Sequence, residues 1–464
     1  MGLLVKNGRV VTEDGILEES ILIEDGKIIE LGKVPEGPSL EVLDAEGAYV
    51  LPGGIDAHTH MELQQSERFR SADDFYTGTV AAALGGTTTI IDHIGFAPAG
   101  SSLRHSLDQY RRKAEKAVVD YSFHGVIQHV DDRILRELKE LIEQEGIASF
   151  KAYSTYGFKI GDADLFRILR VMKEAGGLLT MHCENDAAIS LLKEESRQAG
   201  HTAPIWHART RPERTESEAI ARLCEFSALA GNAPVYIVHT STALGAKRIA
   251  AFRGEGIPVT METCPQYLML TEDKYQAGSR EEGLKYIMAP PLRKEADNEA
   301  LWQSLSDGTC QTIGTDHCPF LLKEKLEGMG DFSLAPGGAG GVQERIPLLF
   351  SEGVLKGRIS VEQLAKLTST NVARIMGLYP GKGTIRPGSD ADLVILREGP
   401  EKIIRARTQA SASDYSIYEG MAHRCRIDHV LSRGEVIVRG GEFLGQRGRG
   451  QFLPRFRNGS EAGL

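Results

Sequence analysis

Two histidines separated by one residue follow an apolar stretch early in the chain. The segment reads Leu51-Pro-Gly-Gly-Ile-Asp-Ala-His-Thr-His60, and a strand-like run at positions 48–51 leads into it. Residues i and i+2 of a β-strand lie on the same face, so His58 and His60 can converge on one point while Thr59 faces away. Neutral imidazole nitrogen is a common ligand of transition metals. An isolated pair of this kind is more often part of an ordinary polar strand. Whether His58 and His60 are metal ligands therefore depends on which other residues accompany them.

Four further residues that could bind a metal or take part in catalysis lie in similar segments later in the chain. Each lies within or at the end of a short apolar run, and they are Lys151, His182, His239 and Asp316. Each has an ordinary structural explanation, because a histidine at a strand end is often only hydrogen-bonded and an aspartate there often caps a helix. Their positions in the fold therefore decide whether they form one site.

The middle of the chain alternates short apolar strands with longer amphipathic helices. The predicted strands are 49–51 leading to His60, 87–94, 121–127, 149–153, 178–182, 235–239, 259–262 and 312–316, and the predicted helices include 103–117, 133–145, 165–175, 216–230, 243–253 and 361–376. Buried strands that alternate with helices indicate a parallel sheet with right-handed crossovers. Eight such units favour a (β/α)8 barrel over an open Rossmann sheet, and no Gly-x-Gly-x-x-Gly motif follows the first strand.

In such a barrel, catalytic groups lie at the carboxyl ends of the strands. The candidate groups follow this rule: His58 and His60 belong to strand one, Lys151 to strand four, His182 to strand five, His239 to strand six and Asp316 to strand eight. Six metal-competent groups at one barrel mouth are hard to explain as six separate structural roles. For His93, His124 and His129 near strands two and three we expect hydrogen-bonding or core roles, while Glu262 on strand seven can face the barrel interior and His317 can support Asp316 or begin a helix.

The two ends of the chain have a different sequence pattern. Short β-prone runs are separated there by hairpin signals such as Asn7-Gly8 and Asp25-Gly26. Each end alone has too few strands to be stable. We therefore predict a β-sandwich domain composed of residues 1–52 and 380–445, a catalytic barrel at 53–379 and a C-terminal tail at 446–464. The arginines of this tail predict a solvated segment or one that packs against another subunit.

The composition indicates which kinds of binding partner and which cellular compartment to expect. A formal net charge of -10 argues against a nucleic-acid partner. The six cysteines are scattered, as expected for reduced thiols in a cytoplasmic protein. Neither a signal peptide nor a transmembrane segment is visible, so no membrane partner is expected.

The set of motifs resembles the amidohydrolase superfamily, and within it the cyclic amidases that include dihydropyrimidinases and hydantoinases. The motifs are Gly54-Ile-Asp-Ala-His-Thr-His60, Gly85-Gly-Thr-Thr-Thr89, Ser149-Phe-Lys151, His182-Cys-Glu-Asn185, Pro290-Pro-Leu-Arg293 and Thr315-Asp-His-Cys-Pro-Phe320. The terminal segments are similar to the composite β-sandwich of that family. The resemblance thus covers essentially the whole chain, and it implies a TIM-like metallo-dependent hydrolase barrel.

The resemblance also implies a site with two divalent metal ions, usually zinc. One ion would be held by His58, His60 and Asp316 and the other by His182 and His239, with Lys151 between them as a carbamate (N6-carboxylysine). A lysine ammonium repels cations, whereas its carbamate is an anion with one oxygen for each metal. Without that modification, Lys151 would be a snorkelling lysine or a cationic clamp for the substrate.

By the same resemblance, a bridging metal hydroxide would attack the amide carbon and Asp316 would transfer the proton to the leaving nitrogen. Tyr156 would donate a hydrogen bond to the oxyanion, with Tyr153 as a nearby competitor. Backbone groups near Ala289 and Gly337 would bind the ring. Relatives of this kind are commonly homotetramers, and we expect the same here.

The segment after the second histidine, Met61-Glu62-Leu63, bears on the substrate. Dihydroorotases usually have an arginine at the position of Glu62, and the segment typical of allantoinases is also absent. The resemblance therefore favours hydrolysis of dihydropyrimidines or 5-substituted hydantoins to N-carbamoyl amino acids, and the stretch 121–128 is similar to phenylhydantoinase-like members. The alternatives are an allantoinase-like hydrolase of cyclic ureides and a non-catalytic scaffold that has lost metal ligands, although all six ligand positions are filled here.

Overall fold

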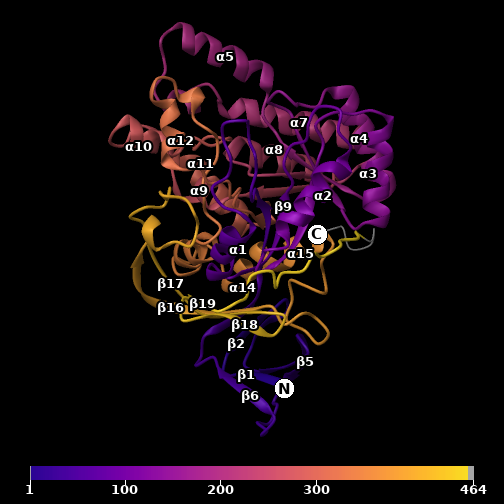
Figure 1. Ribbon diagram of the computed structural model, residues 1–464, viewed down its shortest axis with the longest axis vertical. Coiled ribbons are helices and arrows are strands. Elements are labelled where there is room, and N and C mark those ends of the chain that lie inside the picture. Colours follow the sequence, from indigo (N-terminus) through magenta and orange to yellow (C-terminus); the bar gives the residue numbers. More distant parts are fainter. Residues whose placement is uncertain (1, 458–464) are drawn as a thin grey trace.

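A computed structural model of the protein describes residues 2–457. Figure 1 shows helices and a barrel in the upper part of the molecule and two further sheets below them. Strands from the two ends of the chain, indigo and yellow in the figure, meet in the lower part. No helix within the described range is long and apolar enough to cross a membrane.

Eight parallel strands form the central barrel, in the order of the sequence. They are β8 (Gly54–Thr59), β9 (Thr87–His93), β10 (Asp120–Val126), β11 (Ser149–Tyr153), β12 (Leu178–His182), β13 (Val235–Ile237), β14 (Val259–Thr263) and β15 (Thr312–Ile313). The ring closes where the amide of His60 donates to the carbonyl of His317 at 2.9 Å. The predicted (β/α)8 fold is therefore confirmed.

Helices surround this barrel, and those that precede β15 in the sequence connect its strands. They are α1 (Phe75–Leu84), α2 (Leu103–Ala114), α3 (Asp132–Gln144), α4 (Asp162–Ala175), α5 (Asp186–Gln198), α6 (Trp206–Arg209), α7 (Glu213–Leu229), α8 (Ala243–Gly254), α9 (Pro265–Met269), α10 (Arg280–Leu284), α11 (Glu295–Ser306), α12 (Leu322–Lys325), α13 (Arg345–Leu348), α14 (Val361–Ala365) and α15 (Asn371–Met376). The predicted helix at 361–376 is divided, because residues 366–370 between α14 and α15 form a π-helix.

Helix α3 illustrates how the sequence sets these elements. The carboxylate of Asp131 accepts a hydrogen bond from the amide of Ile134 and so caps the first turn. Ile134, Leu138 and Leu141 follow at spacings of four and three residues and are buried on one face. This pattern makes the helix amphipathic and packs it against the barrel.

Two smaller sheets combine both ends of the chain. One has the order β5-β4-β1-β6 and the other β19-β18-β17-β16-β7-β2-β3. Their strands are β1 (Gly2–Lys6), β2 (Arg9–Thr12), β3 (Gly15–Leu17), β4 (Ser20–Glu24), β5 (Lys27–Gly32), β6 (Leu40–Asp44), β7 (Tyr49–Pro52), β16 (Leu393–Ile403), β17 (Ala422–Ser432), β18 (Glu435–Arg439) and β19 (Glu442–Phe443). A hydrophobic core shared by Val5, Ile21, Ile395 and Leu431 joins the two ends. The domain limits at 52/53, 379/380 and 445/446 stay a prediction.

The chain changes sheets at Gly53, so the predicted first strand is in fact two strands. β7 pairs with β16 in the lower sheet, whereas β8 pairs with β9 in the barrel. A Cβ atom at Gly53 would lie 2.2 Å from the hydroxyl oxygen of Thr88. The carbonyl of Gly53 accepts a hydrogen bond from Ser369 at 2.6 Å. Only glycine fits this crossing point.

The tail folds back onto the barrel of its own chain. Arg455 is buried and donates to the carbonyl of Phe123, to Ser122 and to Ser149. The interpretation of the tail as solvated or subunit-packing is therefore wrong for Arg455. The sequence could not reveal this because the partners are backbone and hydroxyl groups distant in the chain. Residues 458–464 of the predicted tail lie outside the described residues.

Candidate metal centre

The predicted site residues meet in one pocket at the carboxyl ends of the barrel strands. The pocket has a volume of about 430 Å³. Its lining includes the six predicted metal ligands and the three predicted substrate contacts, which are His58, His60, Lys151, His182, His239, Asp316, Tyr156, Ala289 and Gly337. The structure therefore brings together groups that are spread over 280 positions of the sequence.

Asp316 is the point on which the imidazoles converge. Its Oδ1 lies 3.1 Å from Nε2 of His58 and 3.1 Å from Nε2 of His60. Ligand atoms of His58, His239 and Asp316 lie within 4.8 Å of one another, and the rings of His239 and His182 are 4.6 Å apart between centroids. Such spacing is suited to metal ions held between the side chains.

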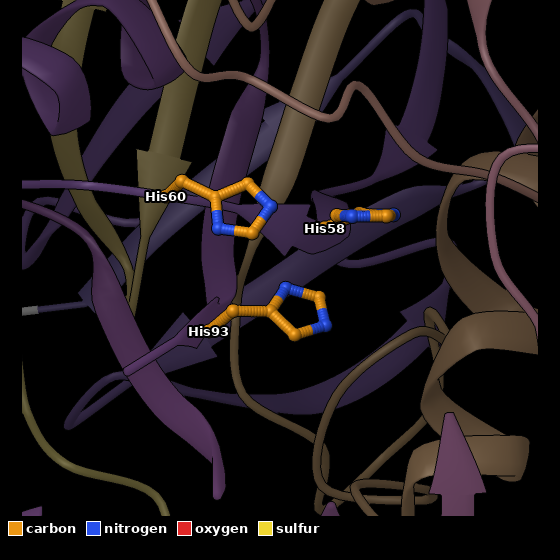
Figure 2. A group of neighbouring side chains, drawn as sticks. All are labelled: His58, His60 and His93. Carbon is orange, nitrogen blue, oxygen red and sulfur yellow. The ribbon is translucent and has the colours of Figure 1, made fainter. Parts of the chain in front are cut away.

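A third histidine belongs to this cluster. His93, at the end of β9, has a ligand atom within 4.8 Å of those of His58 and His60, and Figure 2 shows the three rings around one common space. Among residues 2–457, neither ring nitrogen of His93 has a hydrogen-bond partner, and the same holds for the buried Nδ1 of His60. Buried imidazole nitrogens without partners fit a cation site. Of the two roles predicted for His93, the burial of its side chain agrees with a core role, whereas no hydrogen bond of its ring is found among the described residues.

Glu262 orients the ligands on its side of the site, as its place on strand seven suggested. Its carboxylate is fully buried and lies 2.6 Å from Nδ1 of His58, and it accepts the amide of His239 at 2.9 Å. Tyr236 donates to it at 2.8 Å. Holding the proton on Nδ1 of His58 leaves Nε2 as the ligand atom, which is the usual function of a carboxylate behind a metal-bound histidine.

Glu184 serves His182 in the same way, and sequence reasoning missed it. Its Oε2 lies 2.7 Å from Nε2 of His182, and Arg211 donates to the same carboxylate. Nδ1 of His182 is then the nitrogen left for a metal. The signal for Glu184 was its position two residues after His182, whereas nothing in the sequence pointed to Arg211, in the connection between α6 and α7.

Burial sets the protonation of these groups. It lowers the pKa of His60 to about 4 and holds the pKa of His239 well below its usual range, so both imidazoles are neutral, as metal binding requires. Burial also lowers the pKa of Lys151 to about 8. Although burial favours a neutral acid, the neighbouring His58 and His60 hold the pKa of Asp316 well below its usual range.

Three site residues have left-handed backbone conformations that are rare for side chains other than glycine. The φ angles are 39° at His239, 54° at Asp316 and 72° at Tyr156. The conformations of His239 and Asp316 explain why β13 ends at Ile237 and β15 at Ile313. The predicted strands extended to 239 and 316. Strain of this kind is typical of residues whose orientation serves a site.

The residue next to Asp316 has a supporting role. Nε2 of His317 lies 2.9 Å from the carboxylate of Asp73, and Nδ1 accepts from the amides of Gly341 and Val342. His317 therefore does not begin a helix. It fixes the backbone that carries Asp316.

Above the polar cluster, the pocket wall is largely apolar. Its aromatic and aliphatic residues are Leu63, Phe69, Phe96, Tyr153, Phe158 and Phe332. Tyr153 packs edge-on against Phe158 and Tyr156, at ring distances of 5.0 and 5.9 Å, whereas the ring of Tyr156 also lies 5.4 Å from that of His182. The site thus combines a charged floor with a wall that suits an apolar substituent.

Known proteins share this architecture. Residues 49–437 match the Amidohydrolase family. The chain is 48% identical over 459 residues to a D-phenylhydantoinase of Escherichia coli O1:K1, with 98% of each chain covered. Solved structures of a dihydropyrimidinase from Brevibacillus agri and a D-hydantoinase from Bacillus sp. AR9 are each 40% identical, cover 98% of this chain and 99% of their own, and superpose with TM-scores of 0.95.

Proposed function

This chain belongs to the amidohydrolase family, and on that basis we propose that it hydrolyses the cyclic amide bond of dihydropyrimidines and 5-substituted hydantoins to N-carbamoyl amino acids. The observation that carries the proposal is the convergence of the buried His58, His60 and His239 with the partly buried Asp316 in the pocket. Similarity to hydantoinases over 98% of the chain supports the same reaction.

We propose that the site binds two divalent metal ions, with zinc as the most suitable because four imidazoles dominate the donor set. His58, His60 and Asp316 would hold one and His182 and His239 the other. When bound, such ions supply a deprotonated water at neutral pH and polarise the amide carbonyl. The neutral state of His60 and His239 supports this assignment.

Lys151 would join the two positions as a carbamate. Its unprotonated amine attacks carbon dioxide, a C–N bond forms, and the amine proton is released, which leaves one negative charge shared by two oxygens. The depressed pKa of about 8 supports this step because it makes the neutral amine accessible near neutral pH. Complete burial would shield the product from acid-driven reversal.

Asp316 would move the proton during ring opening. It is anionic at neutral pH, so it can take the proton of the attacking water. It would then return the proton to the ring nitrogen as the C–N bond breaks, which is the two-way role of a general acid–base.

Tyr156 would stabilise the negative oxygen that develops on the attacked carbonyl. Burial raises the pKa of its hydroxyl, which keeps the proton available for donation. We expect Tyr156→Phe to lower kcat by roughly 100-fold, because it removes one donor to the oxyanion and little packing. Steady-state rates on hydantoin measure this effect. A loss of similar size for Tyr153→Phe, with Tyr156→Phe close to wild type, would assign the role to Tyr153 instead.

The pocket favours a neutral ring with an apolar substituent. Glu62 is buried and paired with Arg70 at 2.8 Å, so it offers no cation to a carboxylated ring. The apolar wall would take the 5-substituent, and backbone groups of Ala289 and Gly337 would bind the ureide edge.

A comparison of rates on five rings tests the proposed function. After loading with zinc and bicarbonate, we expect hydrolysis of 5-phenylhydantoin, hydantoin and dihydrouracil. Rates on allantoin and dihydroorotate should be roughly 5- to 150-fold lower, because an unpaired buried polar group costs about 1–3 kcal/mol. A chelator-treated sample is the control. Failure to open any of the five rings with metal bound would refute the proposal and indicate a non-catalytic scaffold. The filled ligand positions argue against that alternative.

We also propose a homotetramer in the cytoplasm. All six cysteines lie within the described residues and are buried and free, which supports a reducing compartment. Exposed Leu191 and Leu229 offer apolar surface for subunit contacts.

A further inference from the structure

One buried cation beside the pocket has no part in the reaction described above. Lys325 ends α12, and its side chain is completely buried. Its ammonium donates to three backbone carbonyls, those of Ile287 at 2.7 Å, Pro336 at 2.8 Å and Gly338 at 2.7 Å. No acidic side chain within residues 2–457 forms an ion pair with it. All three donors of the ammonium are therefore used on the backbone.

These three carbonyls belong to the two segments that line one side of the pocket. Ile287 and Ala289 come from the first segment, and Pro336, Gly337 and Gly338 come from the second. The amide of Gly338 also donates to the carbonyl of Ile287 at 3.1 Å. Lys325 thus ties together the two stretches of backbone proposed to bind the ring.

The hydrogen bonds also determine which way the backbone faces. Lys325 holds the carbonyls on both sides of Gly337, whereas the carbonyl of Gly337 itself accepts from Gln65, another lining residue, at 2.8 Å. The carbonyl of Gly337 therefore points toward a side chain of the pocket lining, whereas the carbonyls on either side of it point toward Lys325.

We propose that Lys325 is a positioning residue that sets the backbone of Gly337 and Ala289 for recognition of the ureide ring. The inference rests on the proposed function. Lys325 would thus affect the affinity for the ring without touching the substrate or the metal ligands. Its hydrogen bonds also explain how two consecutive glycines, at 337 and 338, can form a defined binding edge.

The energetics of burying the Lys325 ammonium agree with its hydrogen-bond geometry. A buried ammonium is stable only when hydrogen bonds replace its water, and the three carbonyls supply them. Burial lowers the pKa of Lys325 to about 7, while the nearby Cys318 and Glu324 act in the opposite direction. A charged ammonium also matches the three acceptors, because a neutral amine has only two N–H donors. Replacing the lysine leaves three buried carbonyls with fewer donors.

The test compares Lys325→Met with Lys323→Met, which removes an exposed lysine from the same helix. We expect Lys325→Met to raise KM by about 10- to 100-fold for dihydrouracil and for 5-phenylhydantoin alike, because both share the ureide ring. We expect kcat within about threefold of wild type and an unchanged metal content, since the lost interaction is ground-state binding. Lys323→Met should match wild type.

A conservative variant separates positioning from general support of the fold. Lys325→Arg keeps the charge and the N–H donors, so it should recover part of the affinity lost in Lys325→Met. A purely structural lysine would lower thermal stability and the active fraction but leave KM unchanged, and that result would overturn the proposal. A loss confined to kcat, or one that follows loss of metal, would overturn it as well.

Two further measures keep the test decisive. If Lys325→Met does not accumulate as folded protein, Lys325→Gln, which retains two N–H donors, takes its place with the same expected rise in KM. Rates of the wild-type protein on the ring panel decide the proposed function. The ratio of KM values between variant and wild type decides the role of Lys325, so the two failures are distinguishable.

Discussion

Replacing Lys151 by alanine is expected to abolish hydrolysis, with a loss of at least about 1000-fold in kcat, because the site loses the anion that would hold both metals. Metal content should fall together with activity. The substitution also opens a cavity in a fully buried position, and a short carboxylic acid such as propionate can enter it and restore a measurable part of both. Elemental analysis and steady-state rates with and without propionate provide the measurement.

The control for this variant is Lys173→Ala, which removes an exposed lysine from α4, the helix after the same strand. It should match wild type in rate and metal content. Full metal content and full rate in Lys151→Ala would exclude the carbamate. Restored activity with an added amine but with no carboxylic acid would instead identify Lys151 as a cationic substrate clamp.

Asp316→Asn is expected to lower kcat by roughly 1000-fold, within the range that general acid–base groups contribute. The amide has the shape of the carboxylate and can still offer an oxygen to a metal, but it cannot carry the proton from water to the ring nitrogen. Metal content should therefore fall much less than activity. Rates on hydantoin and metal analysis of the same preparation make the comparison.

Asp273→Asn, at an exposed position, provides the matched change of charge and should leave the rate unchanged. If Asp316→Asn were to retain a rate within tenfold of wild type with its metals bound, another group would have to transfer the proton. A parallel loss of metal and rate would show that Asp316 acts as a ligand only.

The meeting of the six candidate residues in one pocket could be predicted because barrel geometry converts a position in the sequence into a place in space. Lys151, His182 and Asp316 each stand at or next to the end of a predicted strand, and the ends of parallel strands meet at one mouth of the barrel. Strand periodicity alone then placed His58 and His60 on the same face. None of these steps needed contacts between distant segments.

The supporting residues could not be predicted in the same way. Arg211 and Lys325 lie in connections between strands, and their function depends on which carboxylate or carbonyl the fold brings to them. The predicted domain limit at 52/53 lies at the sheet change, but the division of the first predicted strand there was missed because Pro-Gly-Gly is equally typical of a simple turn. The burial of Arg455 depends on partners in two strands that are more than 300 positions away.

The burial of Arg455 has a consequence for how the molecule is made. Ser149, one of its partners, lies two residues before Lys151 on β11, so both side chains are on the same face of that strand. During synthesis, β11 leaves the ribosome long before residue 455 does. The strand that carries Lys151 therefore gains this partner only after more than 300 further residues have been synthesised, and β7 must likewise wait for β16. These contacts thus cannot form as β7 and β11 are made, although His58 and His60 appear early in the nascent chain.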